Sequence, residues 1–292
     1  MTLDLRAILM GFAFAFIWSS AFSSARIIVA DASPLASLSL RFFVSGLIGI
    51  AIARALGQTW HLTRDQWRAT IIFGVCQNAI YLGLNFVAMQ TVEAGLASII
   101  ASTMPLMVAL ATWVFFRERL PLFGVIGLIL GFAGVALIMS ARLSAGVDLY
   151  GLGLCLIAAA ALTVATLSMR GASSGGNLMM VVGLQMFVGA IVLAIASAAT
   201  ETIHVNPTPE LALAFAYTTL FPGLLATWIW FKLVQRIGAI KAATFHFLNP
   251  FFGVAVAAVI LGETLSTRDI IGVAIIALGI LAVQLARQQK TK

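Results

Sequence analysis

Long apolar runs without a charged residue recur along most of the chain. A helix needs about 20 apolar residues to cross the hydrocarbon core of a bilayer. Nine uncharged runs reach this scale, and a further apolar stretch, 32–53, is interrupted only by Arg41. The pattern therefore predicts ten transmembrane helices. The nine uncharged runs lie at 7–25, 69–92, 94–116, 120–141, 149–169, 171–200, 211–231, 242–262 and 270–286.

These runs predict helices rather than strands of a membrane barrel. Every backbone N–H and C=O group in lipid must be paired inside the protein, and the runs lack the alternation of barrel strands. The composition agrees, because 62% of the residues are hydrophobic and 9% are charged, against about 25% charged in a soluble domain. Connections are short, with Glu93 alone between two runs. We therefore predict an all-α membrane protein without an extramembrane domain.

The second half of the chain repeats the first at a spacing of 145 residues, and of 144 in the earlier helices. Such self-similarity indicates an internal duplication, with a first repeat at 1–145 and a second at 146–292. Each repeat has five predicted helices. Because five is odd, the second repeat enters the membrane from the opposite face, and the repeats are inverted. The matches at 145 pair Gln90, Ala94, Ala97, Pro105, Val114, Glu118, Leu120, Ile126, Gly127 and Gly134 with Gln235, Ala239, Ala242, Pro250, Val259, Glu263, Leu265, Ile271, Gly272 and Gly279.

The distribution of positive charge predicts the orientation. Cytoplasmic ends of membrane helices are enriched in Lys and Arg. With a cytoplasmic N-terminus, thirteen cations fall inside and three, Arg26, Arg142 and Arg268, fall outside. Both termini are therefore expected in the cytoplasm. The inner cations are Arg6, Arg54, Arg64, Arg68, Arg117, Arg119, Arg170, Lys232, Arg236, Lys241, Arg287, Lys290 and Lys292.

The tandem five-helix unit resembles the ten-helix EamA-type exporters of the drug/metabolite transporter superfamily. The resemblance includes the Arg41-Phe42 pair and the glutamate-bearing turns Phe116–Arg119 and Leu261–Thr264. Within that family the chain looks most like the YddG-type exporters of aromatic and other neutral amino acids. The resemblance implies a central cavity lined by helices 1, 3, 4, 6, 8 and 9.

A polar stripe in the third predicted helix is the first candidate for a substrate site. Gly74, Gln77, Asn78, Tyr81 and Asn85 follow helical spacing, and polar groups at membrane depth are expected to face protein or water. Amides and a phenol suit both ends of a zwitterion. Contact between helices is the equal alternative.

The eighth predicted helix has a break where the third has amides. Pro222-Gly223 predicts a kink, which serves either as a hinge or only for packing. Phe221 and Trp228 are candidates for an aromatic wall of the site, although Trp228 could equally face lipid.

The fourth and ninth helices contain matched prolines, Pro105 and Pro250. Each proline removes a backbone donor and bends its helix, so we expect both helices to act as gates. Further substrate-binding candidates lie on these helices and on the first and sixth, although Ser and Thr often bond to their own helix. They are Ser98, Ser102, His246, Asn249, Trp18, Ser19, Thr163 and Thr166.

Few charged groups are expected at membrane depth. Arg41 is a candidate for binding a substrate carboxylate, and the alternatives are a structural tie to neighbouring carbonyls or a snorkelling side chain. His246 can titrate or form a buried hydrogen bond. Glu118 and Glu263 lie at helix ends, where solvation or packing explains them.

The motifs of ATP-binding loops, zinc helices and serine nucleophiles are absent from the sequence. We therefore expect no enzyme activity, metal or cofactor, and no nucleic-acid partner. The expected function is export of neutral, especially aromatic, amino acids across the bacterial inner membrane by alternating access. Export of other small metabolites or drugs is the alternative, and a nucleotide-sugar or phosphate carrier is a weaker one, since it would need several central cations. We expect a monomer in the lipid bilayer.

Overall fold

The structure is a computed structural model that describes residues 4–118, 120–144, 146–168 and 176–290. Ten helical segments in these ranges are long and apolar enough to span a membrane, which confirms the predicted all-α fold. Arg170 and the start of the predicted run at 171 lie outside the described residues.

Several spans are divided into shorter helical pieces. The helices of the first half are α1 (Leu5–Asp31), α2 (Pro34–Ala55), α3 (Arg64–Phe73), η1 (Gly74–Tyr81), α4 (Leu82–Ala88), α5 (Ala94–Ser102), α6 (Met104–Phe116) and α7 (Leu122–Ser144). Those of the second half are α8 (Leu149–Ser168), α9 (Leu178–Thr200), α10 (Pro209–Thr218), η2 (Thr219–Leu225), α11 (Ala226–Ile237), α12 (Ala239–Thr244), η3 (Phe245–Leu248), α13 (Asn249–Leu261) and α14 (Thr267–Lys290).

The chain forms two compact units, and each takes helices from both sequence repeats. Unit 1 comprises Met1–Ser23, Val92–Leu152 and Leu225–Lys292. Unit 2 comprises Ser24–Thr91 and Gly153–Leu224. The compact units and the sequence repeats are therefore two different divisions of the chain.

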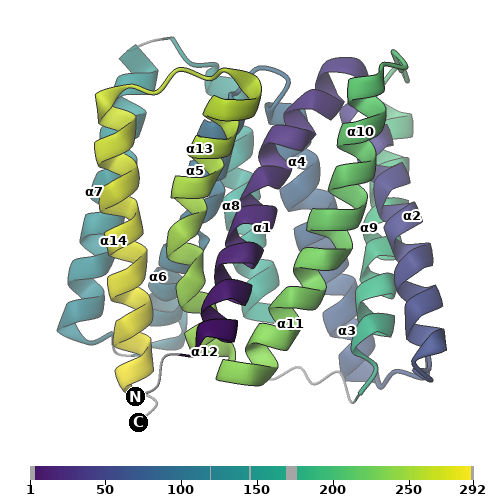
Figure 1. Cartoon of the computed structure of the whole chain (residues 1–292), viewed down its shortest axis with the longest axis horizontal. Helices are drawn as coiled ribbons and strands as arrows, with labels where there is room; N and C mark the ends of the chain where they lie inside the picture. The colour runs from purple at the N-terminus through teal and green to yellow at the C-terminus, as the bar shows by residue number, and fades with distance from the viewer. Residues whose placement is uncertain (1–3, 119, 145, 169–175, 291–292) are drawn as a thin grey trace. The chain divides into compact units, whose positions relative to one another are not determined.

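Within unit 1, the matched helices α7 and α14 lie side by side (Figure 1). A Cβ atom on Gly279 would lie 2.7 Å from the Gly127 carbonyl oxygen, and one on Gly134 would lie 2.9 Å from the Gly272 carbonyl oxygen. Because Gly127 corresponds to Gly272 and Gly134 to Gly279, the two contacts are reciprocal and the helices run antiparallel. Glycine permits this close approach of two backbones.

Within unit 2, the matched helices α2 and α9 pack in the same way (Figure 1). The Ser39 hydroxyl donates to the Ala190 carbonyl at 2.8 Å, and the rings of Phe43 and Phe187 meet edge to face. Phe43 and Phe187 are themselves a matched pair. Antiparallel pairing of matched helices is the structural form of the inverted repeat.

Helix irregularities also recur at matched positions. The π-helical turns η1 and η2 begin at Gly74 and Thr219, which correspond at the 145-residue spacing. Breaks precede both matched prolines: α6 begins at Met104, and α13 begins at Asn249 after the short 3-10 helix η3. Short π segments inside helices occur often at functional sites. The breaks therefore single out the middle of these spans.

The matched helices α6 and α13 end in the same left-handed turn. Arg117 has φ of 53° and Gly262 has φ of 68°. In each turn the next residue, Glu118 or Glu263, donates its N–H to the carbonyl six residues earlier, as in a Schellman motif. Arg117 is the one non-glycine residue with positive φ in the described ranges, and the repeat explains why a left-handed turn is needed there.

Candidate functional site

Two residues of the polar stripe of the third span, Gly74 and Asn78, pack against α9. Asn78 is buried and donates from Nδ2 to the Gln185 carbonyl at 3.0 Å. A Cβ atom on Gly189 would lie 2.5 Å from the Asn78 Cβ, so the missing side chain of Gly189 makes room for the amide. Gly74 likewise faces the Gln185 carbonyl. Asn78 and Gly74 thus hold η1 against α9.

The other residues of that stripe have different surroundings. Tyr81 is buried, and Asn85 donates from Nδ2 to the Tyr81 carbonyl at 2.8 Å. The Asn85 Oδ1 atom is buried without a hydrogen-bond partner, whereas Gln77 is only half-buried. Because the π-helical turns of η1 are wider than α-helical turns, residues at α-helical spacing do not stay on one face here.

The matched contact in unit 2 joins η2 to α2. A Cβ atom on Gly223 would lie 3.4 Å from the Ser45 hydroxyl oxygen and 3.6 Å from Nη2 of Arg41. The neighbouring Pro222 has no backbone N–H and lies inside η2. The structure therefore brings two of the predicted candidates, Arg41 and Gly223, into one place.

Arg41 is buried in the middle of α2, with 5% of its surface exposed. Its guanidinium carbon lies 4.9 Å from the centre of the Phe42 ring. Among the described residues of unit 2, no carboxylate forms an ion pair with Arg41, and its Nε atom has no hydrogen-bond partner. The nearby Ser45 hydroxyl is also buried without a partner. Buried charges are normally paired, so this guanidinium is suited to an anionic group.

Unit 1 contains an aromatic cluster around His246. The ring centroid of His246 lies 5.5 Å from that of Phe14, 6.0 Å from that of Trp18 and 5.3 Å from that of Trp230. Asn249 Nδ2 and His246 Nδ1 are 2.8 Å apart, so the histidine has the buried hydrogen bond that was one of the two interpretations. These groups form a packed cluster rather than an open cavity.

Asn249 links this cluster to α1. The Ser19 hydroxyl donates to the Asn249 carbonyl at 3.1 Å. The Asn249 Oδ1 atom is buried without a hydrogen-bond partner. Trp18, Ser19, His246 and Asn249 therefore meet in unit 1 as a group, while Arg41 and the polar stripe belong to unit 2.

Most of the predicted hydroxyl groups bond to their own helices. Ser102 donates to the Ser98 carbonyl, Thr163 to the Ala159 carbonyl and Thr166 to the Leu162 carbonyl, at 2.7, 2.9 and 2.8 Å. There are two exceptions: the Ser19 hydroxyl donates to Asn249 as described above, and the Ser98 hydroxyl is buried against Gly253 without a hydrogen-bond partner.

The predicted aromatic wall lies at exposed positions. Phe221 is 42% exposed and stacks on Tyr217 at a centroid distance of 5.1 Å. Trp228 is 52% exposed. Pro105 and Pro250 are buried at the first turns of α6 and α13, and Pro222 is half-buried in η2.

Three residues of these regions could not be found by the sequence analysis or were missed by it. Ser45 lies four residues after Arg41, a helical spacing that could have identified it. Phe14 contributes a ring contact and Gln185 a backbone contact, and neither contact leaves a distinct mark in a membrane sequence.

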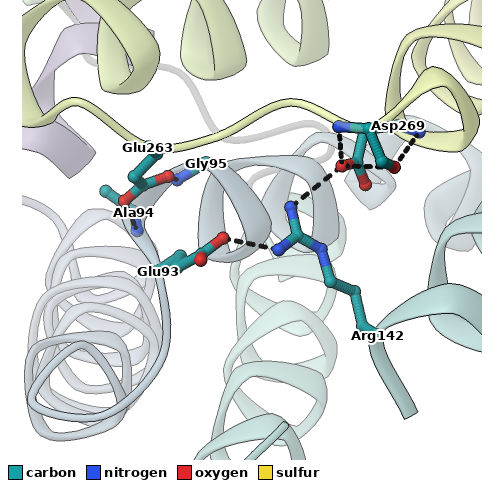
Figure 2. A network of polar contacts seen from close by, with 7 residues as sticks. Glu93, Ala94, Gly95, Arg142, Glu263 and Asp269 are labelled. Carbon is teal, nitrogen blue, oxygen red and sulfur yellow. Dashed lines mark hydrogen bonds and ion pairs between the residues drawn. The ribbon is translucent and has the colours of Figure 1, made fainter. Parts of the chain in front are cut away.

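Several charged residues at the ends of the helices are paired. Figure 2 shows Arg142 donating to Glu93 at 2.7 Å and to Asp269 at 3.2 Å. In the same view, the Glu263 carboxylate accepts from the N–H groups of Ala94 and Gly95 at the start of α5 (Figure 2). A carboxylate is stabilised at a helix N-terminus by the helix dipole. Glu263 therefore has a structural role.

A third ion pair lies at the start of α1. Arg236 Nε donates to the Asp4 carboxylate at 2.6 Å, and this hydrogen bond lowers the pKa of Asp4. The described residues contain no group of three or more His, Cys, Asp or Glu side chains that could hold a metal ion.

The comparison with known families decides the identity of this ten-span fold. The model of the EamA-like transporter family matches residues 5–140 and again residues 149–285. The chain belongs to the EamA-like transporter family. The two matches correspond to the two inverted five-helix repeats.

Other EamA-like chains cover nearly all of this transporter. The "Uncharacterized inner membrane transporter YedA" of Escherichia coli (strain K12) is 28% identical over 94% of this chain and 90% of its own length. The "Uncharacterized transporter YvbV" of Bacillus subtilis (strain 168) is 26% identical over 89% of this chain and 85% of its own. One crystal structure resembles the chain with a TM-score of 0.70 at 22% identity, covering 96% of this chain and 97% of that one.

These relatives are named as transporters, and their names give no substrate. The EamA-like chain is therefore a multi-pass membrane transporter, and family and relatives indicate transport rather than catalysis. The likeness to YddG-type exporters of aromatic amino acids is not confirmed by the names of the relatives.

Proposed function

We propose that this transporter exports neutral, especially aromatic, amino acids across the bacterial inner membrane by alternating access. The supporting observation is the buried guanidinium of Arg41, which has no carboxylate partner in unit 2. Arginine presents several N–H donors in a planar fork that matches a carboxylate. The α-carboxylate of an amino acid would provide the missing partner.

The polarity of the remaining interior favours a substrate without further net charge. Asn85 Oδ1 in unit 2 is a buried acceptor without a partner, and it suits an ammonium group. A phosphate substrate would call for several buried cations, and Arg41 is the one Arg or Lys among the fully buried polar residues described.

The matched helix breaks support alternating access. Inverted repeats can exchange conformations, which opens a central site first to one side and then to the other. Breaks at η1 and η2, and before Pro105 and Pro250, lie at corresponding places in both repeats. We propose that these breaks bend during the exchange, with Pro105, Pro250 and the Pro222–Gly223 pair as hinges. Both termini are proposed to be cytoplasmic, and the transporter to act as a monomer.

Efflux from liposomes tests this function. Vesicles that contain the purified transporter are loaded with radiolabelled phenylalanine, tryptophan, leucine or alanine, and vesicles without protein serve as the control. We expect faster loss of these amino acids through the protein, with the aromatic ones lost fastest. If no neutral amino acid leaves faster than from empty vesicles, the proposed substrate class is wrong.

A further inference from the structure

An exposed groove at the start of the third span contains arginine, tryptophan and isoleucine side chains. It lies along α3 in unit 2 and is lined by Arg64, Asp65, Trp67, Arg68, Ile71 and Ile72. The transport function proposed above uses none of these residues.

The groove faces away from the protein interior. Residues 64, 67, 68, 71 and 72 follow the i, i+3, i+4, i+7 spacing of one helix face. The buried residues of α3 are Ala69 and Thr70, while Trp67 is 37% and Ile71 is 47% exposed. In a membrane-spanning segment, an outward apolar face contacts lipid.

Polarity changes along the groove in the same order as along a phospholipid. Along the helix, Arg64, Trp67 and Arg68 come first, and Ile71 and Ile72 follow. From Arg64 to Ile72 the helix rises about 12 Å, enough to reach from the headgroup region into the hydrocarbon. Tryptophan is enriched at this boundary, and basic residues near the surface attract anionic lipids.

The loop that leads into the groove is held in place. Thr63 and Gln66 form a capping box at the start of α3. Gln58 Oε1 accepts from the Met180 N–H at 3.0 Å, and the Thr59 N–H donates to Asn177 Oδ1 at 3.0 Å. Preorganisation of this kind reduces the entropy lost when a ligand binds.

A further cation lies in the last turn of α2, and a further indole lies in the loop that follows. The Arg54 guanidinium carbon lies 5.0 Å from the centre of the Trp60 ring, and Trp60 is 56% exposed. Over residues 54–68, three arginines are opposed by one acid, Asp65. The local excess of positive charge is complementary to an anionic headgroup.

We propose that this groove binds an anionic phospholipid of the bilayer. Arg64 and Arg68 hold the phosphate, Trp67 lies at the level of the glycerol backbone, and Ile71 and Ile72 contact the first part of an acyl chain. The groove is thus a lipid-binding site on the outer surface of unit 2, separate from the substrate path.

Native mass spectrometry of the purified full-length protein tests the proposal. The protein is titrated with phosphatidylglycerol and with phosphatidylcholine, and the preference is the ratio of their first binding constants. We expect the preference for phosphatidylglycerol to fall roughly five-fold in each of the single variants Arg64→Gln and Arg68→Gln, because each basic residue near the surface contributes about 1 kcal/mol. Both side chains are exposed, so folding is expected to persist.

The matched control is the double variant Lys232→Gln/Lys241→Gln, which removes two exposed cations of unit 1. It should keep the preference of the unmodified protein. An unchanged preference in the arginine variants, or an equal loss in the lysine control, would overturn the proposal. Displacement of the bound lipid by soluble glycerol phosphate would also overturn it, because the ligand would then be a free phosphate.

Fluorescence quenching locates the bound lipid. In nanodiscs, brominated phosphatidylglycerol should quench tryptophan emission more than brominated phosphatidylcholine does. Trp67→Phe should reduce this excess. If the excess quenching is unchanged in Trp67→Phe, the anionic lipid does not bind in the groove.

Discussion

Unit 2 contains the same helix contact twice, and the two copies differ in what they leave unpaired. On one side η1 meets α9, where Asn78 donates to the Gln185 carbonyl beside Gly189. On the other side η2 meets α2 at Gly223, beside Arg41 and Ser45. The repeat matches Asn78 with Gly223, Gln185 with Arg41 and Gly189 with Ser45.

The first copy is complete and the second is open to a partner. Asn78 fills the space above Gly189, and its amide is hydrogen-bonded. In the second copy the glycine, Gly223, is on the π-helical turn, and the larger side chains of Arg41 and Ser45 are on the facing helix α2. Arg41 Nε and Ser45 Oγ are buried without partners. Duplication thus supplied one framework twice, and under the proposed function the first copy stabilises the unit while the second binds substrate.

Replacing Arg41 should have the largest effect on transport. Hydrogen bonds to charged groups contribute about 1.5–3 kcal/mol, so Arg41→Gln should slow amino acid efflux from liposomes by roughly 10- to 150-fold. Stability should change little or rise, because an unpaired buried charge is removed. Thermal unfolding in detergent measures this second effect.

Arg41→Lys is the control that retains the charge. Lysine lacks the planar fork of arginine, so partial activity is expected. If Arg41→Gln unfolds at a much lower temperature than the unmodified protein, Arg41 is a structural tie to neighbouring carbonyls, and the contrast between the two contacts disappears.

Adding one methyl group to each glycine of the two contacts should give opposite results. In Gly189→Ala the Cβ atom would lie 2.5 Å from the Asn78 Cβ, and overpacking of this kind costs about 1–3 kcal/mol. In Gly223→Ala the nearest atom is the Thr218 carbonyl oxygen at 3.3 Å, and Arg41 Nη2 is 3.6 Å away. Gly189→Ala should lower the unfolding temperature, and Gly223→Ala should slow efflux. The same phenotype in both variants would argue against the division of roles.

Asn78→Ala should destabilise the protein without changing its selectivity. The variant loses the hydrogen bond to the Gln185 carbonyl and leaves space above Gly189, at a cost of about 1–3 kcal/mol. Unfolding temperature and the ratio of phenylalanine to leucine efflux are measured together. An altered ratio at unchanged stability would place Asn78 in the substrate path.

The smallest effects are expected at the capped ends of the α2–α9 pair. Glu201 accepts from the N–H groups of Leu35 and Ala36 at 2.8 and 3.0 Å, while Gln58 accepts from the Met180 N–H alone. Removing a cap costs typically about 1 kcal/mol, and Glu201 also gains from the helix dipole. Glu201→Ala should therefore lower the unfolding temperature more than Gln58→Ala, with transport retained in both. The reverse order would show that the two ends are not capped as described.

The ten spans could be predicted from the sequence because uncharged runs of membrane length stand out against short loops. The breaks at Pro105, Pro250 and Pro222 could be predicted as well, since proline lacks the backbone donor. The π-helical turn at Gly74–Tyr81 could not, because no residue marks it. Helical spacing therefore placed Asn78 and Asn85 on one face, whereas their surroundings differ.

The pairing of Arg41 with Gly223 was also beyond the sequence. The two residues are far apart along the chain and belong to different repeats, and neither residue type indicates the other. The sequence showed that Arg41 was embedded and left its role open. The structure adds two facts: η2 packs against α2 with Gly223 beside the guanidinium, and the Arg41 Nε atom has no hydrogen-bond partner.

The most direct test of the account is whether Arg41 recognises the carboxylate of the substrate. Efflux of phenylalanine is compared with efflux of phenylalaninol, in which a hydroxymethyl group replaces the carboxylate, and leakage from empty vesicles is subtracted. We predict a preference for phenylalanine of at least roughly ten-fold in the unmodified protein and none in Arg41→Gln, in line with a charged hydrogen bond. The same preference for phenylalanine in both proteins would contradict the account.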